Sequence, residues 1–294
     1  MRILFVGCVD SSRILLEKLI DMNEDVVGVI TKKESKFNSD FSDLTKLCTS
    51  NNIDYKFVDN INDIDSIEYI KSKAPDIIYC FGWSQIIKKS VIEIPAKGII
   101  GFHPAELPNN RGRHPIIWAL ALGLEKTASS FFFIDEGPDT GDILSQCHVD
   151  ISYNDDAQSL YNKIMNTAIC QVEKFTCELK MDKYSLVKQS KGSGNYWRKR
   201  TKEDGKIDWR MSSYSIYNLV RSLSKPYIGA SFVHNNNDYK VWKVEEIKGI
   251  NLKNVEPGKI LKVYSLNSFL IKTGDQCIKV LHCDDINLKE GDYL

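Results

Sequence analysis

Two polar segments hold the residues best suited to chemistry. The first, residues 101–115 (GFHPAELPNNRGRHP), follows an apolar run directly, which places His103 at or just beyond the end of a strand. The second, residues 135–142 (DEGPDTGD), follows the apolar run FFFI and contains four acids, two glycines and a proline. A neutral imidazole can take or relay a proton near neutral pH, and a carboxylate can orient it or carry the proton itself. The sequence therefore predicts an acid–base pair, with a solvated turn and a strand-end histidine as the alternative interpretation.

The elements that must position these segments alternate between strands and helices. Apolar runs at residues 2–7, 25–30, 76–81 and 98–102 are typical of strands covered on both faces, and helical patterns separate them. This alternation predicts an α/β fold with a mostly parallel, Rossmann-like sheet. Such sheets bind ligands at the carboxyl ends of their strands. Neither GxGxxG nor a phosphate-loop pattern occurs, so the sequence supports no dinucleotide fingerprint and no P-loop.

The last third of the chain predicts a second, smaller domain. An apolar stripe from Leu160 to Leu179 predicts a long helix, after which residues 184–204 are polar, Gly-containing and basic, as is typical of a linker. Beyond them, a helix at residues 213–223 and short strands with turn signals favour a small OB-like β-barrel. We therefore expect a catalytic domain at residues 1–183, a linker at 184–204 and an accessory β-barrel domain at 205–294.

Composition limits the class of protein. The 294 residues include 39 Lys and Arg and 39 Asp and Glu, and this zero net charge argues against a surface that grips nucleic acid along its whole extent. With 43% hydrophobic and 27% charged residues, the chain is an ordinary globular one rather than a disordered one. No apolar run approaches the roughly 20 residues that span a bilayer, and the N-terminal run is too short for a signal peptide. We therefore expect no membrane partner and a cytoplasmic location.

The cysteines predict buried thiols rather than a metal site. Eight are scattered along the chain without a CxxC pair. Cys277, His282 and Cys283 come nearest to a cluster, but alternation within a strand explains them. We expect no metal.

The two polar segments together resemble a known family. HPAELPNNRGRHP followed by FFFIDEGPDTGDIL is similar to the pattern of the folate-dependent formyltransferases, which is Asn-x-His-Pro-x-x-Leu-Pro, then Arg-Gly, then Asp-x-Gly-x-Asp-x-Gly. EDGKIDWRMSSYSIYNLVRSLSKPYIGASF resembles a segment of that family's accessory domain, and PGKIL fits its barrel. The resemblance covers nearly the whole chain. The family includes the sugar-nucleotide N-formyltransferases and methionyl-tRNA formyltransferase.

The resemblance implies transfer of a formyl group from N10-formyltetrahydrofolate, as co-substrate, to an amine. Family members use an Asn, His and Asp triad, and His103 and Asp139 fall on the histidine and aspartate positions. We expect His103 to stabilise the oxyanion and relay a proton, and Asp139 to accept the proton of the amine, directly or through water. The asparagine position is Gly101, which has no side-chain donor. A backbone N–H, a water or another side chain would have to take that part, or activity would be weak.

The resemblance also implies where the substrates bind. The pterin is expected against main chain of the loop FGWSQII and of the turn after the strand FFFID, and the candidate residues are Phe81, Gly82, Trp83, Gln85, Ile86, Asp135, Glu136 and Gly137. Trp83 could pack near the pterin or belong to the core. Arg111, Arg113 and Pro104 are candidates for binding the substrates, the two arginines through anionic groups of donor or acceptor. The alternative is that Arg111 and Gly112 support the loop.

Two amines fit the family: an amino sugar carried on a nucleotide, and methionine esterified to initiator tRNA. The tRNA enzymes carry a basic, Gly-rich loop after the second strand, whereas residues 31–44 have no glycine and balance Lys32, Lys33 and Lys36 with acids. The one strongly basic patch is residues 197–202 (WRKRTK) in the linker. A grip on tRNA requires a cationic surface, so the sequence favours the sugar nucleotide and no nucleic-acid partner.

Other functions stay open. A folate- or nucleotide-binding homologue with weakened catalysis would explain Gly101, although the retained His103 and Asp139 speak against it. Hydrolysis of formyl-folate to formate would need water in place of the amine, and no sequence feature supports it. The second domain could orient substrate, help to build a homodimer or be inherited from a tRNA-binding relative.

Overall fold

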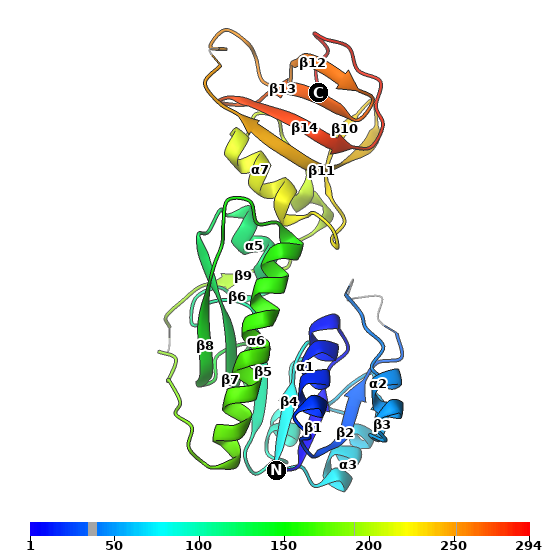
Figure 1. Cartoon of the computed structure of the whole chain (residues 1–294), viewed down its shortest axis with the longest axis vertical. Coiled ribbons are helices and arrows are strands. Elements are labelled where there is room, and N and C mark those ends of the chain that lie inside the picture. Colours follow the sequence, from blue (N-terminus) through cyan, green and yellow to red (C-terminus); the bar gives the residue numbers. More distant parts are fainter. Residues whose placement is uncertain (35–39, 191, 251) are drawn as a thin grey trace. The chain divides into compact units, whose positions relative to one another are not determined.

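The computed structural model describes residues 1–34, 40–190, 192–250 and 252–294 (Figure 1). Its chain forms two compact units, each assembled from separate segments. The first unit consists of Met1–Gly112, Thr127–Val149 and Asn162–Trp197, and the second of Arg113–Lys126, Asp150–Tyr161 and Arg198–Leu294. The linear boundaries at residues 183 and 205 therefore remain a prediction.

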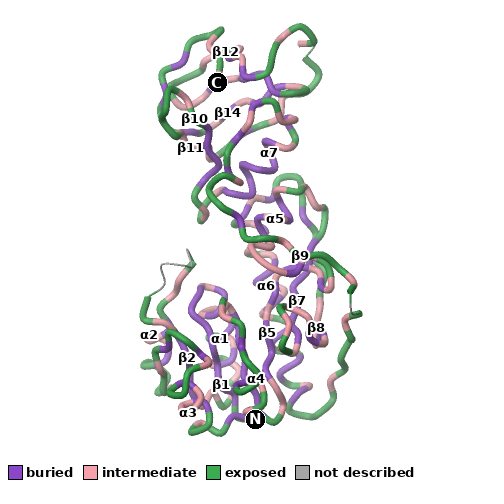
Figure 2. The backbone as a smooth tube through the Cα atoms, turned by 180° about the vertical axis from the view of Figure 1, so that it is seen from behind, coloured by how far each residue is buried: buried purple, intermediate pink, exposed green. Residues whose placement is uncertain are grey.

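A seven-stranded sheet forms the centre of the first unit, in the order β3-β2-β1-β4-β5-β7-β8. Its parallel strands are β1 (Ile3–Val6), β2 (Val26–Thr31), β3 (Tyr55–Phe57), β4 (Ile77–Cys80) and β5 (Ile99–His103). The strand β7 (Lys126–Phe133) runs antiparallel to β5, and β8 (Ile143–Asp150) lies beside β7. The buried strands in Figure 2 match the continuous apolar runs of the sequence. The expected mostly parallel α/β sheet is confirmed.

The helices of the first unit follow their local sequence signals. They are α1 (Asp10–Asp21), α2 (Thr45–Ser50), α3 (Ile64–Lys73), α4 (Lys89–Ile92) and most of α6 (Ala157–Lys180). Asp63 caps α3 by accepting the N–H of Ser66 at 2.8 Å. The predicted stripe of α6 is buried along its length, and Phe175 within it packs against Phe131 of β7 with ring centroids 4.9 Å apart. These contacts fix the strands whose ends carry the polar segments.

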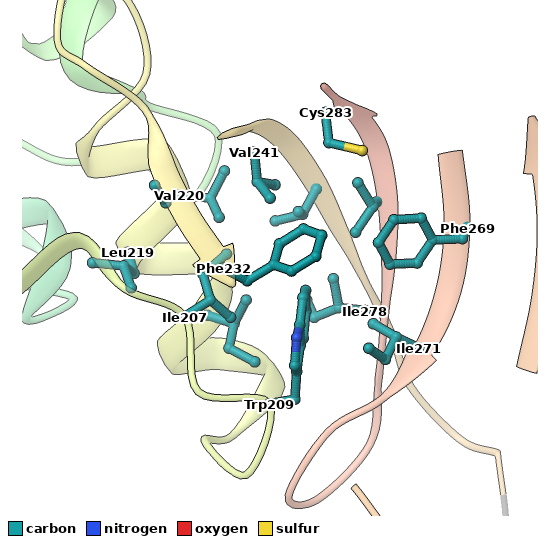
Figure 3. Close-up of a cluster of buried hydrophobic side chains, with 14 of the residues drawn as sticks. Ile207, Trp209, Leu219, Val220, Phe232, Val241, Phe269, Ile271, Ile278 and Cys283 are labelled. Atoms are coloured by element: carbon teal, nitrogen blue, oxygen red, sulfur yellow. The ribbon is translucent and has the colours of Figure 1, made fainter. Parts of the chain in front are cut away.

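The second unit is an antiparallel sheet with helices packed against it. The sheet order is β10 (Ala230–His234), β11 (Asn237–Ile247), β14 (Cys277–Cys283), β13 (Ser268–Lys272) and β12 (Ile260–Ser265). The helices are α5 (Pro115–Ala121), α7 (Ser213–Ser222) and the short η1 (Lys202–Gly205). Trp209, Phe232 and Phe269 meet edge to face in its core (Figure 3). The expectation of a separate C-terminal β domain is confirmed.

Neither unit shows a membrane span or a metal cluster in the part of the chain that the structure describes. There, no helix is long and apolar enough to cross a bilayer. The same residues contain no group of three or more His, Cys, Asp or Glu that could hold a metal ion.

Five thiols are buried, and this has a direct chemical consequence. Cys8, Cys48, Cys80, Cys277 and Cys283 are buried, while the remaining three cysteines are exposed. Burial raises the pKa of Cys48 to about 11, which disfavours the reactive thiolate. We expect a thiol-specific disulfide reagent to label the exposed Cys147, Cys170 and Cys177 in the native protein and all eight after denaturation. Rapid native labelling of five or more thiols would contradict this burial.

Arg221 of α7 ties together separate segments of the second unit. Its Nη1 donates to the carbonyl oxygens of Ser152 (3.0 Å), Tyr153 (3.1 Å) and Asp155 (2.9 Å), and its Nε donates to Asn218 Oδ1 (2.9 Å). The side chain is buried, and this burial lowers its pKa. These contacts indicate that Arg221 has a structural role.

The substitution Arg221→Met should lower the free energy of unfolding by about 2–3 kcal/mol, because buried carbonyl oxygens lose their donor. Urea unfolding followed by circular dichroism measures this loss. An unfolding free energy equal to that of the wild type would show that the network contributes nothing to stability.

Candidate functional site

His103 is the last residue of β5 and is only 5% exposed. Its Nε2 lies 2.8 Å from the carbonyl oxygen of Asn110. A carbonyl can only accept, so Nε2 carries a proton, and Nδ1 is the nitrogen left to take up or give up another. The fold therefore fixes which nitrogen of His103 is available to receive a proton.

Asp139 supplies a carboxylate next to that nitrogen. Its Oδ2 lies 3.8 Å from His103 Nδ1 and also accepts the N–H of Gly112 at 3.0 Å. The first distance exceeds a direct hydrogen bond, and it allows an attractive charge interaction once Nδ1 of the ring is protonated. The structure thus brings together the two side chains that the sequence paired.

The register of the sheet explains how the two segments meet. Because β7 is antiparallel to β5, its last residue, Phe133, lies opposite Ile100, while His103 lies opposite Ser130. The turn after β7 therefore has to travel back past three strand residues, about 10 Å, to bring Asp139 to His103. Gly141 packs tightly against the carbonyl of Phe133, where a Cβ would stand 1.7 Å from the oxygen. The absence of a side chain at Gly141 therefore allows the turn to take this path.

The residue opposite Gly101 in the sheet explains why position 101 carries no side chain. It lies directly opposite Phe132 of β7, and a Cβ at position 101 would stand 2.9 Å from Phe132 Cζ and 3.1 Å from Ile134 Cγ1. Facing residues of paired strands share one face of the sheet, as do residues two apart, so Phe132 lies on the face of His103. An aromatic ring thus occupies the space into which a side chain at position 101 would project.

Two side chains that the sequence did not predict as part of the site hold the loop after His103. Ser130 Oγ donates to the carbonyl of Ala105 at 2.6 Å. Gln146 Nε2 donates to Ser130 Oγ and to the carbonyl of Leu107, both at 2.9 Å. Pro104 is half-buried at the start of this loop. No sequence signal singled out Ser130 and Gln146, because they lie on other strands.

Arg111 is 4% exposed, and its guanidinium is hydrogen-bonded to other groups of the protein. Its Nε lies 3.1 Å from the carbonyl of Asp139, its Nη1 3.0 Å from the carbonyl of Ser193, and its Nη2 2.6 Å from Gln189 Oε1. These contacts favour the supporting role over the binding of a substrate anion. Arg113 is half-buried and belongs to the second unit.

The loop after β4 contains both core and accessible residues. Phe81 is fully buried, and its carbonyl accepts Ser12 Oγ at 2.6 Å. Gly82 has φ +74, and a Cβ there would stand 2.2 Å from Val9 Cγ2. Gln85 bonds to the backbone of Ile61 and Asp59, and Ile86 is 67% exposed. Phe81, Gly82 and Gln85 therefore leave mainly main chain for a ligand.

Trp83 carries a polar atom without a protein partner. Its indole Nε1 is buried, and no hydrogen-bond acceptor among the described residues reaches it. The ammonium of Lys32 lies 5.2 Å from its ring centroid. A buried orphan donor is costly, and a bound polar molecule would satisfy it. The Trp83 ring also packs against the hydrophobic core of the sheet, so its ring belongs to that core while its N–H has no partner among the described residues.

The turn after β7 is organised by its first acid. Asp135 Oδ1 accepts the N–H of Gly137 at 3.0 Å and Thr140 Oγ1 at 2.6 Å. Glu136 is exposed. Asp135 is thus committed to the shape of the turn, and the main chain around Gly137 is what the turn can offer a ligand.

Comparison with known proteins places the whole chain in one family. Residues 1–171 match the family profile "Formyl transferase" and residues 199–290 the profile "Formyl transferase, C-terminal domain". Methionyl-tRNA formyltransferase of Clostridium acetobutylicum is 34% identical over 90% of this chain and 85% of its own length. That of Caldanaerobacter subterraneus subsp. tengcongensis is 29% identical over 96% of this chain and 91% of its length. The bifunctional polymyxin resistance protein ArnA of Wigglesworthia glossinidia brevipalpis is 30% identical over 90% of this chain and 40% of its length.

Solved structures with the same fold include enzymes with a different acceptor. WlaRD, a sugar 3N-formyl transferase solved with dTDP and 5-N-formyl-THF, superposes with TM-score 0.73 and 22% identity over 98% of this chain and 99% of its own. The N-formyltransferase of Helicobacter canadensis, in complex with folinic acid and dTDP-3-aminofucose, gives TM-score 0.73 and 20% identity over 95% of this chain and 98% of its own. At this identity the likeness shows the fold.

Proposed function

Since the chain belongs to the folate-dependent formyltransferases, which use N10-formyltetrahydrofolate, we propose that its acceptor is the amine of a nucleotide-linked amino sugar. The observation that carries the chemistry is the 3.8 Å approach of His103 Nδ1 and Asp139 Oδ2 beside a loop with an orphan donor. Formyl transfer forms a bond from the acceptor nitrogen to the formyl carbon and breaks the bond from that carbon to N10 of the folate. The site must move one proton from the first nitrogen to the second.

His103 and Asp139 can carry that proton in turn. Asp139 accepts it from the attacking amine, directly or through a water, and stands next to the lone pair of His103 Nδ1. Once protonated, His103 donates from both nitrogens, from Nε2 to Asn110 O and from Nδ1 toward the developing oxyanion. The carboxylate stabilises the imidazolium until N10 leaves with the proton.

The remaining candidates fall into two roles. The main chain around Gly82 and Gly137 and the indole of Trp83 would hold the pterin, while Phe81 and Asp135 shape the segments that present them. Arg113 stays a candidate for an acceptor anion. Because Phe132 fills the place beside Gly101, the further oxyanion donor has to come from elsewhere, as a backbone N–H, a water or another side chain.

The arginines of the basic patch at residues 197–202 have contacts within the protein, which supports a small acceptor over tRNA. Arg198 donates to both carboxylate oxygens of Asp204, and Arg200 is 8% exposed with its guanidinium 4.5 Å from the ring centroid of Trp118. Arginines engaged in this way are less available to neutralise an RNA backbone. The balanced charge of the chain points in the same direction. Lys36, one of the three lysines in residues 31–44, lies outside the described residues.

Initiator methionyl-tRNA is the second candidate acceptor. It is favoured by the names of the curated relatives, of which the first five are methionyl-tRNA formyltransferases at 28–34% identity. Names of relatives at this distance favour the reaction more strongly than the acceptor. A homologue with weakened catalysis is the third candidate and follows from Gly101.

A direct transfer assay decides among the three. The protein is offered N10-formyltetrahydrofolate with a panel of nucleotide-linked amino sugars, including dTDP-3-aminofucose, and with initiator methionyl-tRNA. Mass spectrometry then detects the acceptor that gains one formyl group. We expect a sugar nucleotide to gain it. Transfer to tRNA alone would replace the proposal with the second candidate, and folate binding without any transfer would favour the third.

A further inference from the structure

Part of the predicted linker, residues 184–204, contacts the segments of the first unit that carry the candidate site. The short strand β9 (Tyr196–Trp197), labelled in Figure 1, pairs in parallel with β6 (Arg111–Gly112). The N–H of Arg111 donates to the carbonyl of Asn195 at 3.1 Å, and the N–H of Asn110 donates to Asn195 Oδ1 at 3.0 Å. We name Gln189, Ser193, Asn195 and Tyr196 the clasp.

Gln189 uses its whole hydrogen-bonding capacity in the clasp. Its Nε2 donates to the carbonyls of Asp139 (3.0 Å) and Gly141 (2.7 Å). Its Oε1 accepts from Arg111 Nε (3.2 Å) and Nη2 (2.6 Å). A primary amide has two donor hydrogens and two lone pairs, and all four are engaged. One side chain thus joins the Asp139 turn to the Arg111 loop.

Two residues held by the clasp have a left-handed backbone. Asp139 has φ +58 and Asn110 has φ +61, a region that is uncommon for residues other than glycine, although Asp and Asn enter it more readily than most. Such conformations persist when the surroundings over-determine them. The carbonyl of Asp139 is held by Gln189 and Arg111, and the N–H of Asn110 by Asn195. Asn110 in turn offers its carbonyl to His103 Nε2.

We propose that Gln189 is a positioning residue for formyl transfer, which holds the left-handed turn that aims the Asp139 carboxylate at His103. The inference rests on the proposed formyl transfer by this pair. Gln189 touches neither substrate in this role, so its loss should lower turnover and leave the Michaelis constants nearly unchanged. A misplacement of a reacting group by about 1 Å can cost about 100-fold in rate.

Two substitutions separate the functions of the amide. Gln189→Met removes all four hydrogen bonds at similar length, whereas Gln189→Glu keeps an acceptor for Arg111 and loses both donors to the Asp139 turn. We expect each variant to lower kcat by about 10- to 100-fold with KM within about threefold. If Gln189→Glu kept wild-type turnover, the bond to Arg111 alone would matter and the proposal would be overturned.

Gln171→Met is the matched control in the same unit. Gln171 Nε2 donates to the carbonyl of Ser129 at 3.1 Å and to Ser145 Oγ at 2.9 Å, and neither of these bonds reaches the Asp139 turn. This variant should lose stability but keep kcat. An equal loss of kcat in Gln171→Met and Gln189→Met would show a general packing effect and contradict the proposal.

A second readout does not depend on catalysis. The N–H of Gly112 donates to Asp139 Oδ2, so its hydrogen exchange reports whether the carboxylate stays in place. We expect that exchange to be at least about tenfold faster in Gln189→Met and unchanged in Gln171→Met. Should the wild-type protein transfer no formyl group at all, the proposed function fails, and Gly112 exchange alone then decides the positioning role. Unchanged exchange in Gln189→Met would overturn it.

Discussion

Replacing Asp139 with asparagine is expected to lower turnover by about 100- to 10,000-fold, the range that a positioned acid–base group contributes. An amide keeps the size of the side chain but cannot accept the proton of the amine. His103→Ala should give a loss in the same range, because it removes the nitrogen 3.8 Å from the carboxylate. The Michaelis constants for folate and acceptor should change little, since neither group contributes mainly to ground-state binding. Steady-state kinetics of formyl transfer measures these losses.

Asp142→Asn provides the control for Asp139→Asn. It makes the same chemical change three residues away in the same turn, and the main chain of Asp142 already anchors Phe133 N–H at 2.9 Å. We expect turnover close to that of the wild type. If Asp139→Asn lost no more turnover than Asp142→Asn, Asp139 would not act in the chemical step.

Restoring the family asparagine at position 101 should be harmful in this protein. In Gly101→Asn the new Cβ would meet Phe132 Cζ at 2.9 Å and Ile134 Cγ1 at 3.1 Å, so these side chains have to shift to admit it. Such overpacking costs about 1–3 kcal/mol of unfolding free energy. Turnover should fall as well, because β5 also positions His103. Urea unfolding and formyl-transfer kinetics measure the two effects.

Phe132 provides the test of that explanation. Phe132→Ala alone opens a cavity and should cost about 3–5 kcal/mol. In the protein with both Gly101→Asn and Phe132→Ala, the cavity accepts the asparagine, so the total cost should be smaller than the sum by about 0.5–3 kcal/mol. Strictly additive losses in the four-protein cycle would mean that the two side chains do not compete for space.

Local patterns predicted most of the fold because most of its elements depend on local signals. The continuous apolar runs became the parallel strands, and the stripe on α6 became its buried face. Helix α4 begins only at Lys89, because tertiary hydrogen bonds of Gln85 hold the preceding segment as a loop. Asn235 and Asn236, with φ +49 and +63, form the tight turn that joins β10 to β11.

The residues of the site could be predicted from the sequence only where each lies within a recognisable motif. His103 and Asp139 belong to segments whose composition is unusual, and the structure places them together. Gln189 acts on Asp139 from 50 residues away, in a segment whose polar composition is that of a linker. The reason for Gly101 lies in Phe132, which is a neighbour only through the register of β5 and β7. Contacts between distant segments leave no periodic signal in the sequence.

The rate of a single turnover in the double variant tests most directly whether His103 and Asp139 act together. The measurement follows transfer of the formyl group with enzyme in excess, for wild type, His103→Ala, Asp139→Asn and the protein carrying both changes. Residues that move one proton as a unit show strongly non-additive losses. We predict that the double variant is no slower than the slower single variant. A double variant slowed by the product of the two single losses would show that the two residues act independently and would contradict the proposed mechanism.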